Sequence, residues 1–153
     1  MKDRATVLCV RDDRILLVAR ERSRWALPGG RIRRDEAPHE AALRELEEET
    51  TLVADDLAYL FRFDGFNAQH HVFFAELGPH LTALPSNEIA KCNWFAPVKI
   101  ATLSASVPTR GIVELFFLPT HRRCEAGRRP ADVGAGGPDD PMSPWPHLPG
   151  RRR

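Results

Sequence analysis

The sequence has few cysteines, and their placement suits neither a disulfide framework nor a zinc site. Its three cysteines, Cys9, Cys92 and Cys124, are odd in number and widely spaced, and none belongs to a C-x-x-C pair. Small secreted domains usually carry an even, closely spaced set, and structural zinc sites carry paired ligands. The cysteine pattern therefore indicates a reducing compartment and excludes both of these classes.

Long hydrophobic runs and a strong charge of one sign are also missing. No run reaches the roughly 18 apolar residues of a membrane-spanning helix, and no apolar segment follows a basic start. The formal net charge is only +1, which gives no general attraction to nucleic acid or to a membrane surface. We therefore expect a cytoplasmic protein without a membrane or nucleic-acid partner, and the sequence leaves the oligomeric state open.

The composition divides the 153 residues into two parts. Residues 1–120 have enough apolar residues for one domain. Residues 121–153 hold six of the thirteen prolines and five of the ten glycines and end in three arginines. Such a segment buries too little apolar surface to offset the entropy of ordering, so a disordered tail is expected. The alternative is a basic arm that contacts nucleic acid or another partner, although Asp132, Asp139 and Asp140 dilute its charge.

Hydrophobic periodicity in residues 1–120 predicts a mixed α/β domain. One helix is expected to begin near Pro38, because proline suits the first helical turn, and a second to span Ser106–Phe117. Strands are expected at Ala5–Val10, Ile15–Val18, Trp25–Pro28, Leu57–Phe63, His71–Leu77 and Asn93–Ala96.

The most informative feature is a set of carboxylates on the first of these helices. Helical spacing places Glu45, Glu48 and Glu49 on one face. Like charges at this spacing destabilise an isolated helix by roughly 0.2–0.5 kcal/mol per pair. A hard divalent cation such as Mg2+ prefers such oxygen ligands. The cluster therefore indicates metal-assisted chemistry on a substrate that carries phosphates.

The same segment matches a long motif with fixed spacing. The Nudix box is written G-x5-E-x7-R-E-U-x-E-E-x-G-U, where U is aliphatic. Thr51 stands where the motif has its second glycine, and every other motif position is filled: Gly30, Glu36, Arg44, Glu45, Leu46, Glu48, Glu49 and Leu52. From about Ala5 to Leu118 the chain resembles a Nudix hydrolase of the MutT-like type.

This resemblance implies a fold and a reaction. The Nudix fold is a mixed β-sheet sandwiched between α-helices, an α/β/α sandwich. The family hydrolyses the pyrophosphate linkage of a nucleoside diphosphate joined to another group. Magnesium, with Mn2+ as a substitute, would neutralise the phosphates and lower the pKa of a bound water.

Roles for the box residues follow from the resemblance. Glu45, Glu48 and Glu49 would ligate the metal, and Glu45 or Glu48 would act as general base. Arg44 would orient a glutamate through a two-point ion pair. Gly30 would offer its carbonyl to the metal.

Two further acidic residues have open roles. Glu36 would either join the metal shell or pair with Arg44. Glu88, six residues before Trp94, stands where the family often has a metal ligand outside the box. The alternative for Glu88 is an ordinary solvated loop residue.

The substrate is less constrained. Arg20 and Arg24, on a loop before the box, could bind phosphate oxygens, and Asn67 could read a base edge. Ordinary solvated loop roles are the alternatives for all three. Markers of ADP-ribose and dinucleoside polyphosphate enzymes are missing, which favours a nucleoside triphosphate, normal or oxidised.

Thr51 departs from the motif at the end of the helix. The motif glycine follows the helix, where a left-handed residue is common. A β-branched residue there costs about 1–2 kcal/mol, unless the helix ends differently.

The alternatives to a hydrolase of small nucleotides are a nucleotide-sensing regulatory domain and an RNA 5′-end pyrophosphohydrolase. The intact set of carboxylates argues against a pure sensor.

Overall fold

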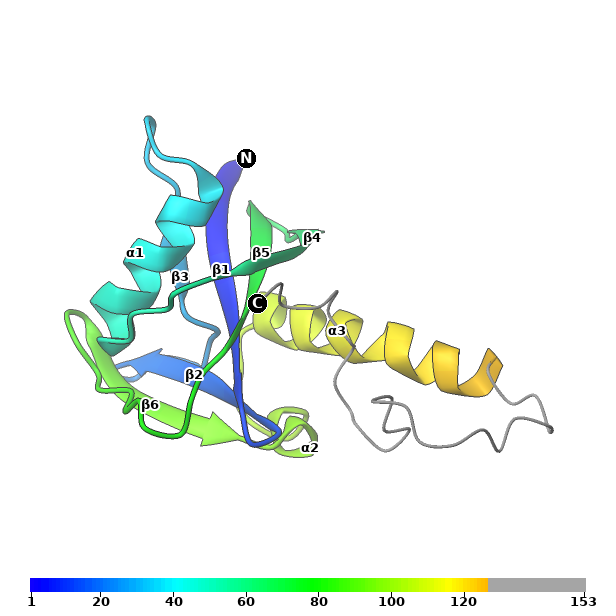
Figure 1. Cartoon of the computed structure of the whole chain (residues 1–153). Coiled ribbons are helices and arrows are strands. Elements are labelled where there is room, and N and C mark those ends of the chain that lie inside the picture. Colours follow the sequence, from blue (N-terminus) through cyan, green and yellow to red (C-terminus); the bar gives the residue numbers. More distant parts are fainter. Residues whose placement is uncertain (127–153) are drawn as a thin grey trace. The chain divides into compact units, whose positions relative to one another are not determined.

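A computed structural model describes residues 1–126, with side chains to Phe117 (Figure 1). These described residues form six strands and three helices. In order, they are β1 (Lys2–Arg11), β2 (Arg14–Arg20), β3 (Gly29–Arg31), α1 (Pro38–Thr50), β4 (Ala58–Asp64), β5 (Ala68–Glu76), β6 (Ile89–Phe95), α2 (Pro97–Ile100) and α3 (Val107–Ala126). The expected mixed α/β fold is confirmed.

The strands form one mixed sheet with the order β4-β5-β1-β2-β6, and β3 also pairs with β1. The central pair, β1 with β5, is parallel, and the other pairs are antiparallel. Asp12 and Asp13 join β1 to β2 with φ angles of 48° and 59°. Two residues with positive φ make a turn whose twist suits a hairpin. The hairpin expected from the sequence is confirmed.

Helix α1 packs against one face of the sheet, as Figure 1 shows. Its apolar residues recur at helical spacing and lie on the buried side, whereas Glu47 is exposed. Alternate residues of β1 meet them, because successive strand residues point to opposite faces. The fully buried residues on this side include Ala5, Val7, Cys9, Leu16, Ala41, Ala42 and Leu46. The helix that carries the carboxylates is therefore fixed to the centre of the sheet.

The chain divides into two compact units, residues 1–112 and 113–153. In the first unit, the beginning of α3 lies against β4 through Gly111, where a Cβ would come within 2.6 Å of the Phe63 ring. The second unit is described only as the continuation of α3 to Ala126. The tail expected over 121–153 lies largely outside the described residues, and the boundary at residue 120 stays a prediction. No helix in the described part of the chain is long and apolar enough to span a bilayer.

The prediction of a strand at Trp25–Pro28 was wrong. Trp25 and Ala26 form only isolated bridges, and the strand that pairs with β1 begins at Gly29. Pro28 has no N–H to donate to a sheet, although its carbonyl accepts a hydrogen bond from Val7 N at 2.8 Å. Trp25 instead packs edge-to-face on Phe95, with ring centroids 4.9 Å apart.

The ends of two other strands also differ from the sequence-based expectation. β5 begins at Ala68 rather than His71, and β6 begins at Ile89 rather than Asn93. The added residues are polar or mixed, so their hydrophobic pattern did not indicate a strand. They are held by pairing with β1 and β2, which depends on residues distant in the sequence.

Candidate active site

Helix α1 begins where the loop of the box turns toward the sheet. Ala37 is the N-cap residue and has no side-chain acceptor to offer. Glu40 partly replaces this cap, because its carboxylate accepts a hydrogen bond from Ala37 N at 3.0 Å. One turn earlier, Glu36 accepts a hydrogen bond from Arg33 N at 3.0 Å. These contacts fix the start of the helix and place Glu36 beside it.

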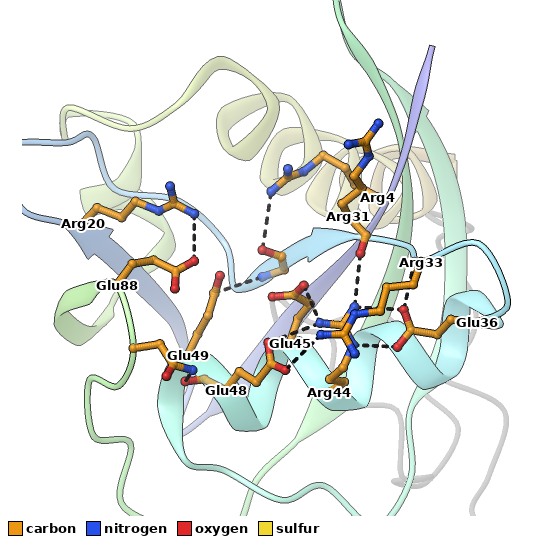
Figure 2. A network of polar contacts seen from close by, with 12 residues as sticks. Arg4, Arg20, Arg31, Arg33, Glu36, Arg44, Glu45, Glu48, Glu49 and Glu88 are labelled. Carbon is orange, nitrogen blue, oxygen red and sulfur yellow. Dashed lines mark hydrogen bonds and ion pairs between the residues drawn. The ribbon is translucent and has the colours of Figure 1, made fainter.

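Arg44 is the centre of the polar network (Figure 2). Its Nε and Nη2 donate to the two oxygens of Glu36 at 2.6 and 2.8 Å. Its Nη1 donates to Glu45 at 2.8 Å and to Glu48 at 3.2 Å, and Nη2 also reaches the Arg31 carbonyl at 3.1 Å. A guanidinium has five N–H donors, so these five contacts match its full capacity. Arg44 therefore joins the loop to two of the helix carboxylates.

This network perturbs the ionisation of both partners. The hydrogen bond from Arg44 lowers the pKa of Glu36 to about 2, and the Glu36 contact raises the pKa of Arg44. Glu36 therefore stays a carboxylate throughout the physiological range. Of the two roles expected for Glu36, the structure shows the pairing with Arg44.

Gly30 is required by the close approach of Glu45. A Cβ at position 30 would lie 2.2 Å from Oε1 of Glu45. Real Cβ atoms do not tolerate such a separation, so any side chain here would displace the carboxylate. Gly29, with φ of +155°, is equally restricted, because a Cβ there would lie 2.3 Å from the Ala5 carbonyl. The glycine pair lets β3 pass closely under the carboxylates of α1.

Glu49 is the buried carboxylate of the site and is only 5% exposed. Its Oε2 accepts a hydrogen bond from Gly29 N at 3.2 Å. Burial raises its pKa to about 7, the Gly29 contact opposes this, and the charges of Glu45 and Glu88 add to the rise. Three carboxylates from the helix and the loop before β6 thus influence one another electrostatically.

The loop before β6 closes the C-terminal end of α1. The last carbonyls of a helix lack partners within the helix. Here Leu84 N donates to Thr50 O at 2.9 Å, Ser86 N donates to Glu49 O at 3.2 Å, and the Asn87 side chain donates to Glu48 O at 2.9 Å. This docking has no local signal in the sequence, because it joins segments more than thirty residues apart. It brings the next residue, Glu88, to the site.

A cavity of about 250 Å³ opens beside Glu49. Its polar side chains are Glu49 and three arginines, Arg4, Arg20 and Arg24, and its remaining walls are formed by Val18, Ala26, Leu27, Gly29 and Ile89. Arg20 also pairs with Glu88 at 2.9 Å, and both of these side chains are more than half exposed. The expected phosphate-binding arginines therefore do lie beside the box.

Two residues depart from the expected set. Asn67 lies in the turn between β4 and β5, where its carbonyl accepts a weak hydrogen bond from Lys2 N at 3.4 Å, and it does not line the cavity. Its role in base reading stays a prediction. Arg4 was not among the expected site residues, because an arginine at the polar start of a strand carries no local signal of function.

The carboxylate oxygens of the site are the type of ligand that a hard divalent cation binds. Within the part of the chain that the structure describes, no three His, Cys, Asp or Glu side chains converge closely enough to hold one ion. Glu45 and Glu48 instead accept hydrogen bonds from Arg44. Carboxylate and carbonyl oxygens are nevertheless the ligands that Mg2+ prefers.

Comparison with known proteins agrees with this geometry. A profile described as the NUDIX domain matches residues 1–116. A candidate 8-oxo-dGTP diphosphatase of Bacillus subtilis (strain 168) is 31% identical over 112 residues, which cover 71% of this chain and 66% of that protein. The chain thus spans just under two thirds of the length of this curated relative.

Two solved structures show the same fold at low sequence identity. A candidate Nudix hydrolase family member from Chromobacterium violaceum superposes with a TM-score of 0.67 and 28% identity, covering 82% of this chain and 79% of that one. A MutT Nudix hydrolase from Burkholderia pseudomallei gives a TM-score of 0.63 and 25% identity, covering 74% and 95%. Because the NUDIX domain profile spans most of the chain and these structures share its fold, the chain belongs to the Nudix hydrolase family.

Proposed function

We propose that this protein is a divalent-metal-dependent hydrolase that cleaves the pyrophosphate linkage of a nucleoside triphosphate, normal or oxidised. One observation carries the proposal. Glu49 lines a cavity with three arginines and is close enough to Glu45 for that carboxylate's charge to raise its pKa. A metal held at the carboxylates and phosphates held at the arginines would therefore meet at this residue.

Glu45, Glu48 and Glu49 of α1, the Gly30 carbonyl and Glu88 would hold Mg2+, or Mn2+ in its place. When bound, the ion would supply Lewis-acid neutralisation of the phosphates and a lowered pKa for a bound water. Magnesium usually keeps several waters, so not all of these oxygens need to ligate directly. Glu36 is omitted from this set, because Arg44 and Arg33 bind its two oxygens.

The other residues of the site would take the proton, orient the carboxylates and bind the phosphates. Glu45 or Glu48 would take the proton of the attacking water, since a carboxylate near the reacting water can act as general base. Arg44 holds both of these side chains and would set their orientation. Arg20 and Arg24 would bind phosphate oxygens, for which planar guanidinium groups are well suited.

The experiment that tests the proposal measures phosphate and pyrophosphate release with and without Mg2+. The panel contains normal and oxidised deoxynucleoside triphosphates, ADP-ribose, a dinucleoside polyphosphate and 5′-triphosphate RNA. Metal-dependent release from the triphosphates is expected. Preference for RNA would favour the RNA-end hydrolase instead, and silence of the folded protein would favour the sensing domain.

A matched pair of variants tests the metal site. Glu49→Gln removes a proposed ligand from the buried face of α1 and is expected to abolish turnover while the fold persists. Glu47→Gln makes the same chemical change on the exposed face of the helix and should leave activity unchanged. An active Glu49→Gln protein would show that the metal site is misassigned.

A further inference from the structure

The cavity beside Glu49 is lined by side chains of only three kinds. They are the guanidinium groups of Arg4, Arg20 and Arg24, the carboxylate of Glu49, and short aliphatic groups. Among the described residues that line it, none carries an amide, a hydroxyl, an imidazole or an aromatic ring. The polar chemistry of the cavity is therefore dominated by hydrogen-bond donors.

This composition is poorly suited to reading a base. A base edge presents donors and acceptors together, and a guanidinium has five donors and no acceptor. The Watson–Crick edge and the N7–H group of 8-oxoguanine both require acceptors. The one acceptor side chain, Glu49, already accepts a hydrogen bond from Gly29 and belongs to the proposed metal set. The cavity has no remaining side chain that would recognise the oxidised base.

The same composition suits a chain of phosphates. Guanidinium groups bind phosphate oxygens in two-point contacts. The volume of about 250 Å³ lies below the roughly 300–1,000 Å³ typical of sites that enclose a whole drug-sized ligand. Part of a nucleotide fits it better than the whole. Because Glu49 forms part of the wall, that part is the one nearest the proposed metal.

Arg4 is the most firmly placed of the three arginines. It belongs to β1, a central strand that pairs with both β3 and β5 at this position. Its Nη2 lies 3.4 Å from the Gly29 carbonyl, a long contact that leaves other N–H groups for a ligand (Figure 2). Arg20 and Arg24, in contrast, are exposed, and Arg20 is engaged by Glu88.

We propose that Arg4 is a substrate-binding residue, and that this cavity selects its substrate by the charge of a phosphate chain rather than by the identity of the base. The inference rests on the proposed hydrolase function and deepens it. It assigns the protein a broad nucleoside triphosphate substrate class, in which normal and oxidised bases are treated alike. Recognition by charge also predicts that affinity falls with ionic strength.

The first test compares kcat/KM for the four normal deoxynucleoside triphosphates and 8-oxo-dGTP. The values are expected to lie within about tenfold of one another, because a site that hydrogen-bonds to a substrate group discriminates far more strongly, by about 10⁴-fold or more. A preference above about 100-fold for one base would overturn the inference and leave the hydrolase function intact. Arg4→Met should lower all five values by a similar factor. A loss confined to guanine nucleotides would show base reading by Arg4 and would also overturn it.

The second test does not depend on turnover. Binding of inorganic tripolyphosphate to the metal-free protein is measured by calorimetry at two salt concentrations. Arg4→Met is expected to weaken binding by about 10- to 100-fold, as for lost hydrogen bonds to a charged group. The control, Arg62→Met on β4, removes an arginine that pairs with Asp64 and does not line the cavity, so its affinity should be unchanged. Equal affinity of wild type and Arg4→Met would overturn the inference even if no nucleotide is hydrolysed. If Arg4→Met does not fold, the same binding measurement is made on Arg24→Met, which lies on the exposed loop. Weaker tripolyphosphate binding would support the inference, and unchanged binding would overturn it.

Discussion

Arg44 and Glu36 form a two-point ion pair that joins the box loop to the middle of α1. Nε and Nη2 of Arg44 lie 2.6 and 2.8 Å from the two carboxylate oxygens. The arginine and glutamate side chains are 18% and 13% exposed. A two-point contact with limited solvent access is stronger than an ordinary surface ion pair. The pair therefore stabilises the loop as well as orienting the carboxylates that share Arg44.

Glu36→Gln is expected to lower the free energy of unfolding by about 1–2 kcal/mol, because it removes the charge from a hydrogen-bonded pair near the surface. Urea denaturation at pH 7 measures the effect. Glu47→Gln, on the exposed side of the same helix, is the control and should change stability by less than about 0.5 kcal/mol. Equal stability of the two variants would mean that the pair does not stabilise the fold.

The contribution of Glu36 should also depend on pH. Its pKa is about 2 in the folded protein against an ordinary value of 4.5. The unfolded chain therefore takes up a proton first, and the stabilisation present above pH 4.5 is lost as pH falls toward 2. The stability difference between wild type and Glu36→Gln should shrink over this window. A difference that stays constant from pH 6 to pH 3 would contradict the assignment.

Metal affinity is expected to rise with pH up to about 7. Burial raises the pKa of Glu49 to about 7 in the metal-free protein, and a ligating carboxylate must lose its proton. Calorimetric titration with Mn2+ should show an apparent affinity that increases up to about tenfold per pH unit below 7 and then levels off. Glu49→Gln should bind more weakly and lose this pH dependence between pH 5.5 and 7. A pH-independent affinity in wild type would exclude Glu49 as a ligand.

Thr51→Gly is expected to stabilise the protein. Thr51 ends α1 in the left-handed region, with φ of 62°, and its N–H donates to Glu47 O at 2.9 Å. Relief of the left-handed strain, reduced by the greater entropy of glycine in the unfolded chain, leaves a gain of about 0.5–1 kcal/mol. The gain would appear as a higher Tm. Thr51→Ala keeps a Cβ in the strained conformation and should gain less, so equal Tm values for the two variants would contradict this explanation.

The end of α1 departs from the motif in residue type but not in backbone conformation. The motif places a glycine at position 51, and the backbone adopts the conformation that a glycine would favour although threonine is present. The helix is held to this end by contacts beyond itself, including the backbone of residues 84 and 86 and the Asn87 side chain. Local preference is overruled here because the tertiary contacts are numerous and the strain is small.

The family, the start of α1, the hairpin and the three carboxylates on one helical face could all be predicted from the sequence. These features depend on residues within one or two turns of each other, and fixed helical or strand periodicity relates them directly. Three features could not be predicted in this way and depend on the folded chain. Arg44 pairs with Glu36, Arg4 joins Arg20 and Arg24 around one cavity, and Glu49 is buried. These outcomes depend on strand pairing and packing between distant segments, and burial and charge act through space rather than along the chain.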